Sequence, residues 1–149
     1  MEAVIFIGIQ GAGKSTFFKQ RFVDTHLRLN LDMLRTRHRE NLLFEACLAA
    51  KQPFVLDNTN LTRAARAGYI ARARAEHFKV VGYYFRADLK TALARNAARE
   101  GKAQIPEKGV LAAYRRLELP RHDEGFDELF YVASHEDGGF TLTEWNDEI

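Results

Sequence analysis

Short apolar segments alternate with longer amphipathic segments along the chain. Each apolar segment is four to six residues long and rich in β-branched or aromatic residues, which is typical of strands buried in a parallel sheet. Gly8 ends the first of these segments. The expected strands are residues 4–7, 27–30, 54–57, 80–85 and 129–133, with residues 140–145 as a sixth candidate.

Helices are expected between the strands, at residues 14–23, 39–51, 62–78, 88–99 and 108–119. Pro53 blocks continuation of the second helix. The third helix is rich in Ala and Arg, which favour helices, and Thr62 or Asn60 is its expected N-cap. The second helix is expected to turn one side toward the core, and the apolar residues on that side are Leu42, Leu43, Ala46, Leu48 and Ala49.

This alternation of strands and helices predicts an α/β fold, with a central parallel five-stranded sheet flanked by helices. Right-handed crossovers in such a sheet place the active site at the carboxyl ends of the strands. The polar residues that we consider below all follow expected strands. We therefore expect one domain over residues 1–149, with its site at that edge of the sheet.

The composition is that of an ordinary globular protein, with 46% hydrophobic and 28% charged residues among 149. Cys47 is the only cysteine, which excludes an internal disulfide and fits a reducing compartment. No apolar run approaches the roughly 18 residues needed to cross a bilayer, and no basic leader precedes the first strand. We expect a cytoplasmic protein without a membrane segment, and the sequence leaves its oligomeric state open.

Charge is distributed unevenly along the chain, although the net charge is only +2. Residues 63–121 contain 14 basic and 5 acidic residues, whereas residues 122–149 contain 9 acidic residues and no Lys or Arg. The basic middle segment suggests a surface that faces a polyanion. The alternatives are a solvated face or a patch that serves only the phosphates of ATP.

Residues 8–15 match the phosphate-binding pattern G-x-x-x-x-G-K-[ST] at every position, between an expected strand and an expected helix. Glycine permits backbone angles that aim successive N–H groups at a phosphate, at the N-terminus of a helix. Lys14 is expected to reach the β- and γ-phosphates of ATP, and the Ser15 hydroxyl to ligate Mg²⁺. The alternative is a loop that has kept its shape without its ligand. The expected nucleotide-binding residues of this loop are Gly8, Gly11, Ala12, Gly13, Lys14, Ser15 and Thr16.

Two acidic residues follow expected strands. Asp32 comes just after the second strand, where it is placed to accept the proton of an attacking hydroxyl group. The alternative is that Asp32 caps a following helix. Asp57 ends the third strand, as does the second acidic residue with which P-loop proteins hold Mg²⁺. The alternative for Asp57 is an ordinary turn after the strand.

Further candidates lie on both sides of these carboxylates. Thr59 and Asn60 come shortly after Asp57 in the sequence. All three residues are expected to orient the acceptor. Arg95 and Arg99 are four residues apart on an expected helix, so their side chains share one face, with Arg95 on the nucleotide side. Guanidinium groups in a lid over approximately residues 95–108 would neutralise charge on the phosphoryl group in transfer. The alternative is a surface helix with scattered arginines.

The five histidines and Cys47 show no spacing typical of a zinc site. Cys47, Trp145, Phe126 and Tyr131 are expected to pack in the core, although an aromatic residue near the lid could instead contact adenine.

These motifs resemble the kinase module of polynucleotide 5′-hydroxyl kinases, a family of P-loop phosphotransferases. Residues 8–16 resemble its phosphate loop, residues 30–32 (N-L-D) its N-R-D element, and residues 57–60 its D-N-T-N element. Residues 95–106 resemble its lid, and residues 114–126 its closing segment. The order and spacing of the motifs agree over most of the chain, which implies a P-loop kinase fold with an arginine-bearing lid.

The resemblance implies transfer of the γ-phosphate of ATP to the 5′-hydroxyl end of DNA or RNA. It implies that Asp32 is the base, that Arg35 supports the acceptor side, and that Arg99 contacts the moving phosphoryl group. Ile105 occupies the position whose apolar side chain packs against the acceptor nucleotide in such kinases. The arginine of the family's N-R-D element, which contacts the acceptor's phosphate, is Leu31 here.

Three functions are consistent with these observations. The motifs and the basic middle segment favour a polynucleotide 5′-hydroxyl kinase. Leu31 and the isolated kinase domain favour a kinase of a small hydroxylated metabolite, sugar or antibiotic. A non-enzymatic ATP-binding switch is the third. The expected cofactors are ATP and Mg²⁺.

Overall fold

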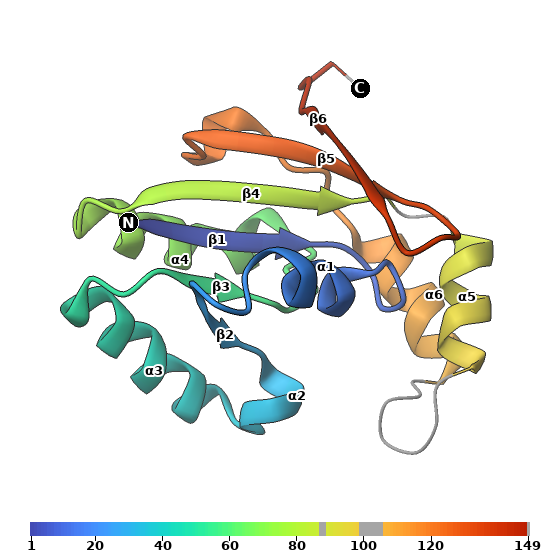
Figure 1. The fold of residues 1–149 in the computed structure, drawn as a ribbon, viewed down its shortest axis with the longest axis horizontal. Coiled ribbons are helices and arrows are strands. Elements are labelled where there is room, and N and C mark those ends of the chain that lie inside the picture. Colours follow the sequence, from blue (N-terminus) through green and yellow to red (C-terminus); the bar gives the residue numbers. More distant parts are fainter. Residues whose placement is uncertain (87–88, 99–105, 149) are drawn as a thin grey trace.

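A six-stranded sheet forms the centre of the computed structural model, which describes residues 1–86, 89–98 and 106–148 (Figure 1). The strand order is β2-β3-β1-β4-β5-β6. The first five strands of this order are parallel, and β6 pairs with β5 in the antiparallel sense. The five-stranded parallel sheet is therefore confirmed, and the sixth candidate is an antiparallel edge strand. The strands are β1 Glu2–Ile7, β2 Leu27–Leu29, β3 Phe54–Leu56, β4 Lys79–Phe85, β5 Glu128–Ser134 and β6 Phe140–Glu144.

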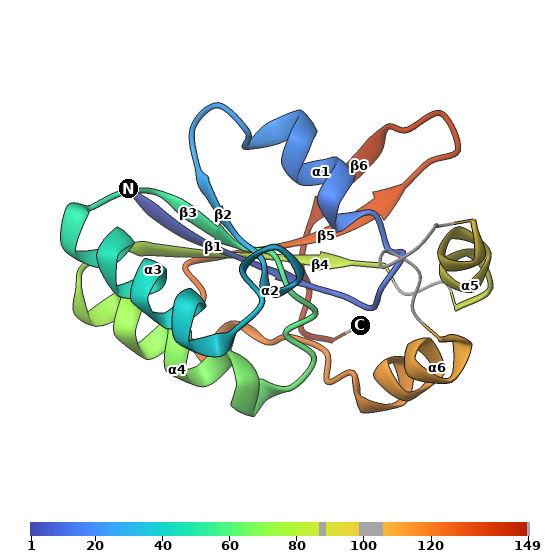
Figure 2. The ribbon, with the colours of Figure 1, turned by 90° about the horizontal axis from the view of Figure 1, so that it is seen from below.

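Helices cover both faces of the sheet (Figure 2). Helix α1 lies on one face, and α3 and α4 lie side by side on the other, while α5 and α6 pack together at the end of the sheet. In the described residues the helices are α1 Lys14–Arg21, α2 Leu31–Leu34, α3 Arg37–Ala50, α4 Arg63–Ala75, α5 Leu89–Ala97 and α6 Glu107–Arg116, with a short 3₁₀ helix at His122–Glu124.

The two faces of β1 enter two different cores, because successive side chains of a strand point to opposite sides. Val4 and Phe6 pack with Phe17 and other aromatic residues of α1. Ile5 and Ile7 belong to the layer beneath α3 and α4. Both faces of the sheet are thus buried, which explains why β1 is a continuous apolar run.

Side-chain caps fix where three helices begin. The Thr36 and Thr62 hydroxyls accept hydrogen bonds from the backbone N–H groups three residues later, at the starts of α3 and α4. Thr62 is one of the two caps predicted for α4. The third cap is Asn30, which accepts from Met33 N at the start of α2. Asp32 therefore lies in the first turn of α2, and the alternative that it caps this helix is wrong.

The predicted buried side of α3 is wrong. Leu42 and Leu43 are 57% and 41% exposed, and Ala46 and Ala49 also face solvent. Of the predicted residues only Leu48 is buried, and it shares the buried side with Glu40, Phe44 and Cys47. The orientation follows from Glu40, whose carboxylate accepts hydrogen bonds from Asn58 and Tyr69 inside the fold. These tertiary contacts decide which side faces the core, and the apolar pattern did not contain them.

Arg66 of α4 is fully buried and links this helix to the segment around Glu124. Its guanidinium forms a two-point ion pair with Glu124, with nitrogen-to-oxygen distances of 2.9 and 3.1 Å. The same group donates to the backbone oxygens of Asn60 (2.9 Å) and Glu118 (3.1 Å). The start of α4 and the segment of residues 118–124, which are far apart in the sequence, are therefore joined by one cation.

We predict that Arg66→Ala destabilises the protein strongly, because it leaves the Glu124 carboxylate buried without its cation. The expected loss in the free energy of unfolding is about 3–5 kcal/mol, measured by urea denaturation. Arg72→Ala is the matched control in the same helix, since Arg72 pairs with Glu45 and Glu76 at the surface, where ion pairs contribute little. Equal losses in the two variants would contradict the role given to Arg66.

Candidate active site

The predicted phosphate loop joins β1 to α1. Gly11 and Gly13 have φ values of 80° and 100°, which residues other than glycine rarely adopt. Gly13 is the N-cap residue of α1, so the loop ends at the positive end of a helix dipole. This is the backbone arrangement that the motif predicts for an anion site.

Side chains hold the loop from two directions. The Lys14 ammonium donates to the backbone oxygens of Gly8 (2.7 Å) and Ile9 (2.8 Å), which places it over the loop. From α5, Arg95 donates to Gly11 O at 3.2 Å. A Cβ added at Gly11 would lie 2.7 Å from the backbone oxygen of Ala92, so α5 rests directly on the loop.

Hydrogen bonds join the loop to the segments that follow β2 and β3. Gly8 N donates to Thr59 O at 3.0 Å. The Asn30 side chain donates to Asp57 O at 2.6 Å, and Leu31 N donates to the Asn58 side chain at 2.9 Å. The N-L-D and D-N-T-N segments are therefore one hydrogen-bonded unit beside the phosphate loop.

A cavity of about 480 Å³ opens at this edge of the sheet and brings most of the candidates together. Its lining includes Gly11, Lys14 and Ser15 of the loop, Asp32 of α2, and Asp57, Thr59 and Asn60 after β3. The lining also includes Arg37, Tyr69 and Arg116, which sequence reasoning missed because they come from three different helices. A volume of this size is in the usual range for a small-molecule site.

Hydrogen bonds join two lining residues of the cavity, Asn58 and Tyr69, to a buried carboxylate. Glu40 is buried beneath Asn58, whose amide donates to it at 2.9 Å. Burial, followed by the hydrogen bond to Glu40, raises the pKa of Tyr69 to about 12. The Tyr69 phenol is thus protonated at neutral pH and donates to the Glu40 carboxylate.

Other predicted residues lie apart from this cavity or have additional contacts. Thr16 and Arg35 are exposed and are not among its lining residues. The Asn60 amide lines the cavity but also donates to Phe6 O at 2.8 Å, joining the ends of β1 and β3. Arg99 and Ile105 lie outside the described residues, as does half of the predicted lid, residues 99–105.

Arg28 is a further residue that sequence reasoning missed. It lies in the middle of β2, and its guanidinium reaches both Asp57 Oδ2 (2.7 Å) and Ser15 Oγ (2.9 Å). A basic residue inside a three-residue strand gives no motif, so only the tertiary structure reveals this contact. The two residues predicted to hold Mg²⁺ thus face a single cationic side chain.

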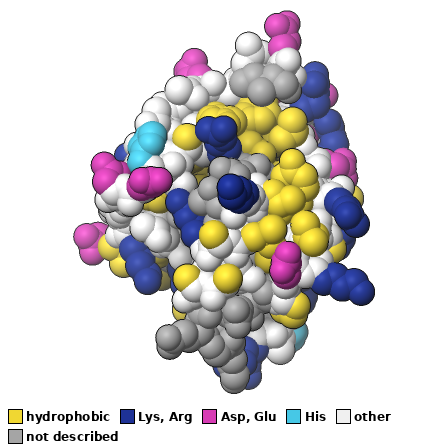
Figure 3. Space-filling view, turned by 90° about the vertical axis from the view of Figure 1, so that its right-hand side faces the viewer, with side chains coloured by type: hydrophobic (Ala, Val, Ile, Leu, Met, Phe, Trp, Pro, Cys, Tyr) yellow, Lys and Arg dark blue, Asp and Glu magenta, His cyan; other side chains and the backbone are white. Residues whose placement is uncertain are grey.

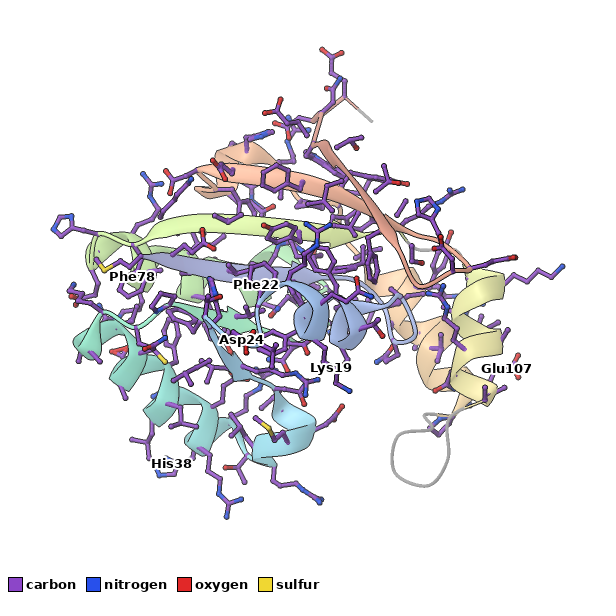
Figure 4. All side chains as sticks on the ribbon, in the orientation of Figure 1. Lys19, Phe22, Asp24, His38, Phe78 and Glu107 are labelled. Atoms are coloured by element: carbon purple, nitrogen blue, oxygen red, sulfur yellow. The ribbon has the colours of Figure 1, made fainter. Side chains whose placement is uncertain are left out.

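The donor set of Ser15 and Asp57 fits a hard cation. A hydroxyl and a carboxylate are the oxygen ligands that Mg²⁺ prefers, and both already converge on a positive group. Within the described ranges, no group of three or more His, Cys, Asp or Glu residues could hold a metal ion. His38, for example, projects from the outer side of α3 (Figure 4). None of the described helices combines the length and apolar character needed to cross a bilayer.

The sequence pattern of a family described as an AAA domain matches residues 4–120, which is more than three quarters of the chain. The chain belongs to this AAA domain family. The matched residues run from β1 to just after α6 and so include every described residue of the candidate site.

This AAA domain has a curated relative in Schizosaccharomyces pombe, a bifunctional polynucleotide phosphatase/kinase. The two are 26% identical over 132 residues, which cover 86% of this chain and 32% of the relative. The chain thus spans about a third of the length of that protein.

Solved structures resemble this AAA domain in fold. A gluconokinase from Sinorhizobium meliloti 1021 has a TM-score of 0.60 at 18% identity, over 89% of this chain and 82% of that one. Chaetomium thermophilum Kti12, in complex with ADP-AlF3, has a TM-score of 0.64 at 16% identity, over 91% and 92% of the two chains. These likenesses confirm the predicted P-loop kinase fold.

We predict that Gly11→Ala destabilises this AAA domain by about 1–3 kcal/mol, because alanine is strained at a positive φ and its Cβ would meet the backbone of α5. Gly68→Ala is the matched control. Gly68 lies within α4 with open space around it, so the same change should stabilise the helix by about 0.5–1 kcal/mol. Urea denaturation of both variants measures the two effects, and the same sign in both would refute this account of the loop.

Proposed function

We propose that this domain transfers the γ-phosphate of ATP to a hydroxyl acceptor, with the 5′-hydroxyl end of DNA or RNA as the leading candidate. One observation carries the proposal: Lys14, Ser15 and Asp32 line the same cavity, with a phosphate loop at one side and an exposed carboxylate at the other. An in-line transfer needs the attacking hydroxyl oxygen opposite the leaving β,γ-bridging oxygen at the γ-phosphorus, with the proton acceptor within reach of that hydroxyl group.

In this proposal the loop N–H groups and Lys14 bind the phosphates. Asp32 accepts the proton as the hydroxyl oxygen attacks the γ-phosphorus, while the bond from that phosphorus to the β,γ-bridging oxygen breaks and ADP leaves. Arg95, already in contact with the loop, stands on the nucleotide side. Mg²⁺ bound with ATP would neutralise charge on the phosphates, and Ser15 and Asp57 are the residues that would hold it.

The lining of the cavity supports a phosphate-bearing acceptor. Arg37 and Arg116 line the same cavity as Asp32, and each guanidinium can donate two hydrogen bonds to a phosphate. They would supply positive charge on the acceptor side, where Leu31 supplies none. Lys and Arg side chains also stand on the end of the molecule formed by α5 and α6 (Figure 3). The likeness to the Schizosaccharomyces pombe phosphatase/kinase supports the same acceptor class.

Phosphorylation of a small hydroxylated metabolite, sugar or antibiotic is the second candidate. Leu31 stands where the polynucleotide 5′-hydroxyl kinases have an arginine that contacts the acceptor. The cavity also has the volume of a small-molecule site. The fold likeness to a gluconokinase agrees with this alternative without selecting it.

We expect the wild-type protein to label a 5′-hydroxyl oligonucleotide from ATP carrying a radioactive γ-phosphate. Asp32→Asn keeps the size of the side chain but removes the proton acceptor, and should lower the rate about 10²–10⁴-fold. The assay offers single-stranded and duplex DNA and RNA, together with gluconate and other small alcohols, each with Mg²⁺.

Asp24→Asn is the control for this experiment. Asp24 is exposed and precedes β2, whereas Asp32 follows it, so the control lies at the opposite end of the strand and should leave the rate unchanged. Labelling of small alcohols alone would select the second candidate. Transfer that survives Asp32→Asn at the wild-type rate would exclude the proposed base.

A further inference from the structure

The guanidinium of Arg28 lies between the two side chains assigned to the metal. Arg28 Nε donates to Asp57 Oδ2 at 2.7 Å, and Arg28 Nη2 donates to Ser15 Oγ at 2.9 Å. The Asp57 side chain is only 2% exposed, and that of Arg28 26%. The ring of Phe18 lies 5.8 Å from Arg28 Cζ, on the side of α1. The cation is therefore held by a carboxylate, a hydroxyl and an aromatic ring.

This arrangement uses the oxygen atoms that a divalent cation would need. Ser15 Oγ accepts a hydrogen bond from Arg28 Nη2, and Asp57 Oδ2 accepts one from Arg28 Nε. Asp57 is a buried anion, and Arg28 already compensates its charge. A divalent cation at the same position would meet electrostatic repulsion from the guanidinium, which is permanently charged.

We propose that Arg28 is a built-in cation of the nucleotide site, which makes nucleotide binding less dependent on Mg²⁺. The inference rests on the proposed function for the assignment of the phosphate loop and its metal ligands. Without the metal, the guanidinium supplies positive charge beside the phosphates of ATP. With the metal, Ser15 must release its hydrogen bond to Arg28, so part of the affinity gained from Mg²⁺ is lost.

The same geometry makes Arg28 a positioning residue. From strand β2, it contacts both side chains that are expected to hold Mg²⁺, those of Ser15 and Asp57. A lysine at this position would keep the charge but could not contact both oxygen atoms with a planar fork. Substitution of Arg28 by lysine can therefore separate the effect of the positive charge from that of the two-point contact.

The test measures how strongly Mg²⁺ and ATP binding are coupled, with no acceptor present. The dissociation constant of ATP is determined by calorimetry in excess EDTA and in saturating Mg²⁺, and the ratio of the two values gives the coupling. We expect this ratio to rise about tenfold or more in Arg28→Ala, through weaker binding in EDTA and a larger gain from Mg²⁺. Arg28→Lys should give an intermediate ratio.

Arg21→Ala is the matched control, because it removes an arginine that lies over Phe17 in the last turn of α1, away from the phosphate loop. It should leave the ratio at the wild-type value. If Arg28→Ala does not fold because Asp57 is left unpaired, Arg28→Lys keeps a positive charge beside Asp57 and still tests the two-point contact.

The outcomes separate this inference from the proposed function. An unchanged ratio in Arg28→Ala and Arg28→Lys, or an equal loss of affinity with and without Mg²⁺, would overturn the role of Arg28 while leaving phosphoryl transfer intact. A raised ratio in a protein that phosphorylates no acceptor would support Arg28 and count against the proposed reaction. Failure of the wild type to bind ATP in either condition would overturn both.

Discussion

The site depends on hydrogen bonds that join the carboxyl ends of β2, β3 and β1. Backbone pairing ends with the strands, so the segments beyond them need other contacts to stay together. Side chains of asparagine supply these contacts, because an amide can donate and accept at the same time. Asn30 bonds to the segment after β3, Asn58 bonds back to the start of α2, and Asn60 reaches the end of β1. The carboxylate of Asp32 and the phosphate loop take their relative positions from this network.

A second layer supports the network from below. Asn58 also donates to the buried carboxylate of Glu40, which accepts from Tyr69 and Arg37. Burial of a carboxylate is costly unless it is fully hydrogen-bonded, and three donors from three different elements meet that need here. The same contacts rotate α3 so that Leu42 and Leu43 face solvent. A polar requirement at the site thus determines the packing of a whole helix.

Features that depend on local sequence could be predicted, and features that depend on distant contacts could not. The strands, the five-stranded parallel sheet and the positive φ values of the phosphate loop follow from short patterns of apolar and glycine residues. Thr62 could be predicted as a helix cap because its own hydroxyl group accepts the capping hydrogen bond. The buried side of α3 and the role of Arg28 depend on partners tens of residues away. The cap at Asn30 depends on a choice between neighbouring polar residues. No periodicity or motif encodes those contacts.

The uneven charge along the sequence becomes largely paired in the fold. Basic residues of α4 and β4 form ion pairs with the acidic segment near the end of the chain: Arg63 with Asp123, Arg66 with Glu124, Arg74 with Asp127, and Lys79 with Glu128. Part of the positive charge of the middle segment is therefore neutralised within the described fold. Among the basic residues of this segment that the structure describes, Arg95 contacts the phosphate loop and Arg116 lines the cavity. A polymer gripped along its length needs many phosphate contacts, whereas these two positions can serve only a few. The charge distribution thus favours recognition of a strand end, or of a small anionic acceptor, over binding along a long nucleic acid.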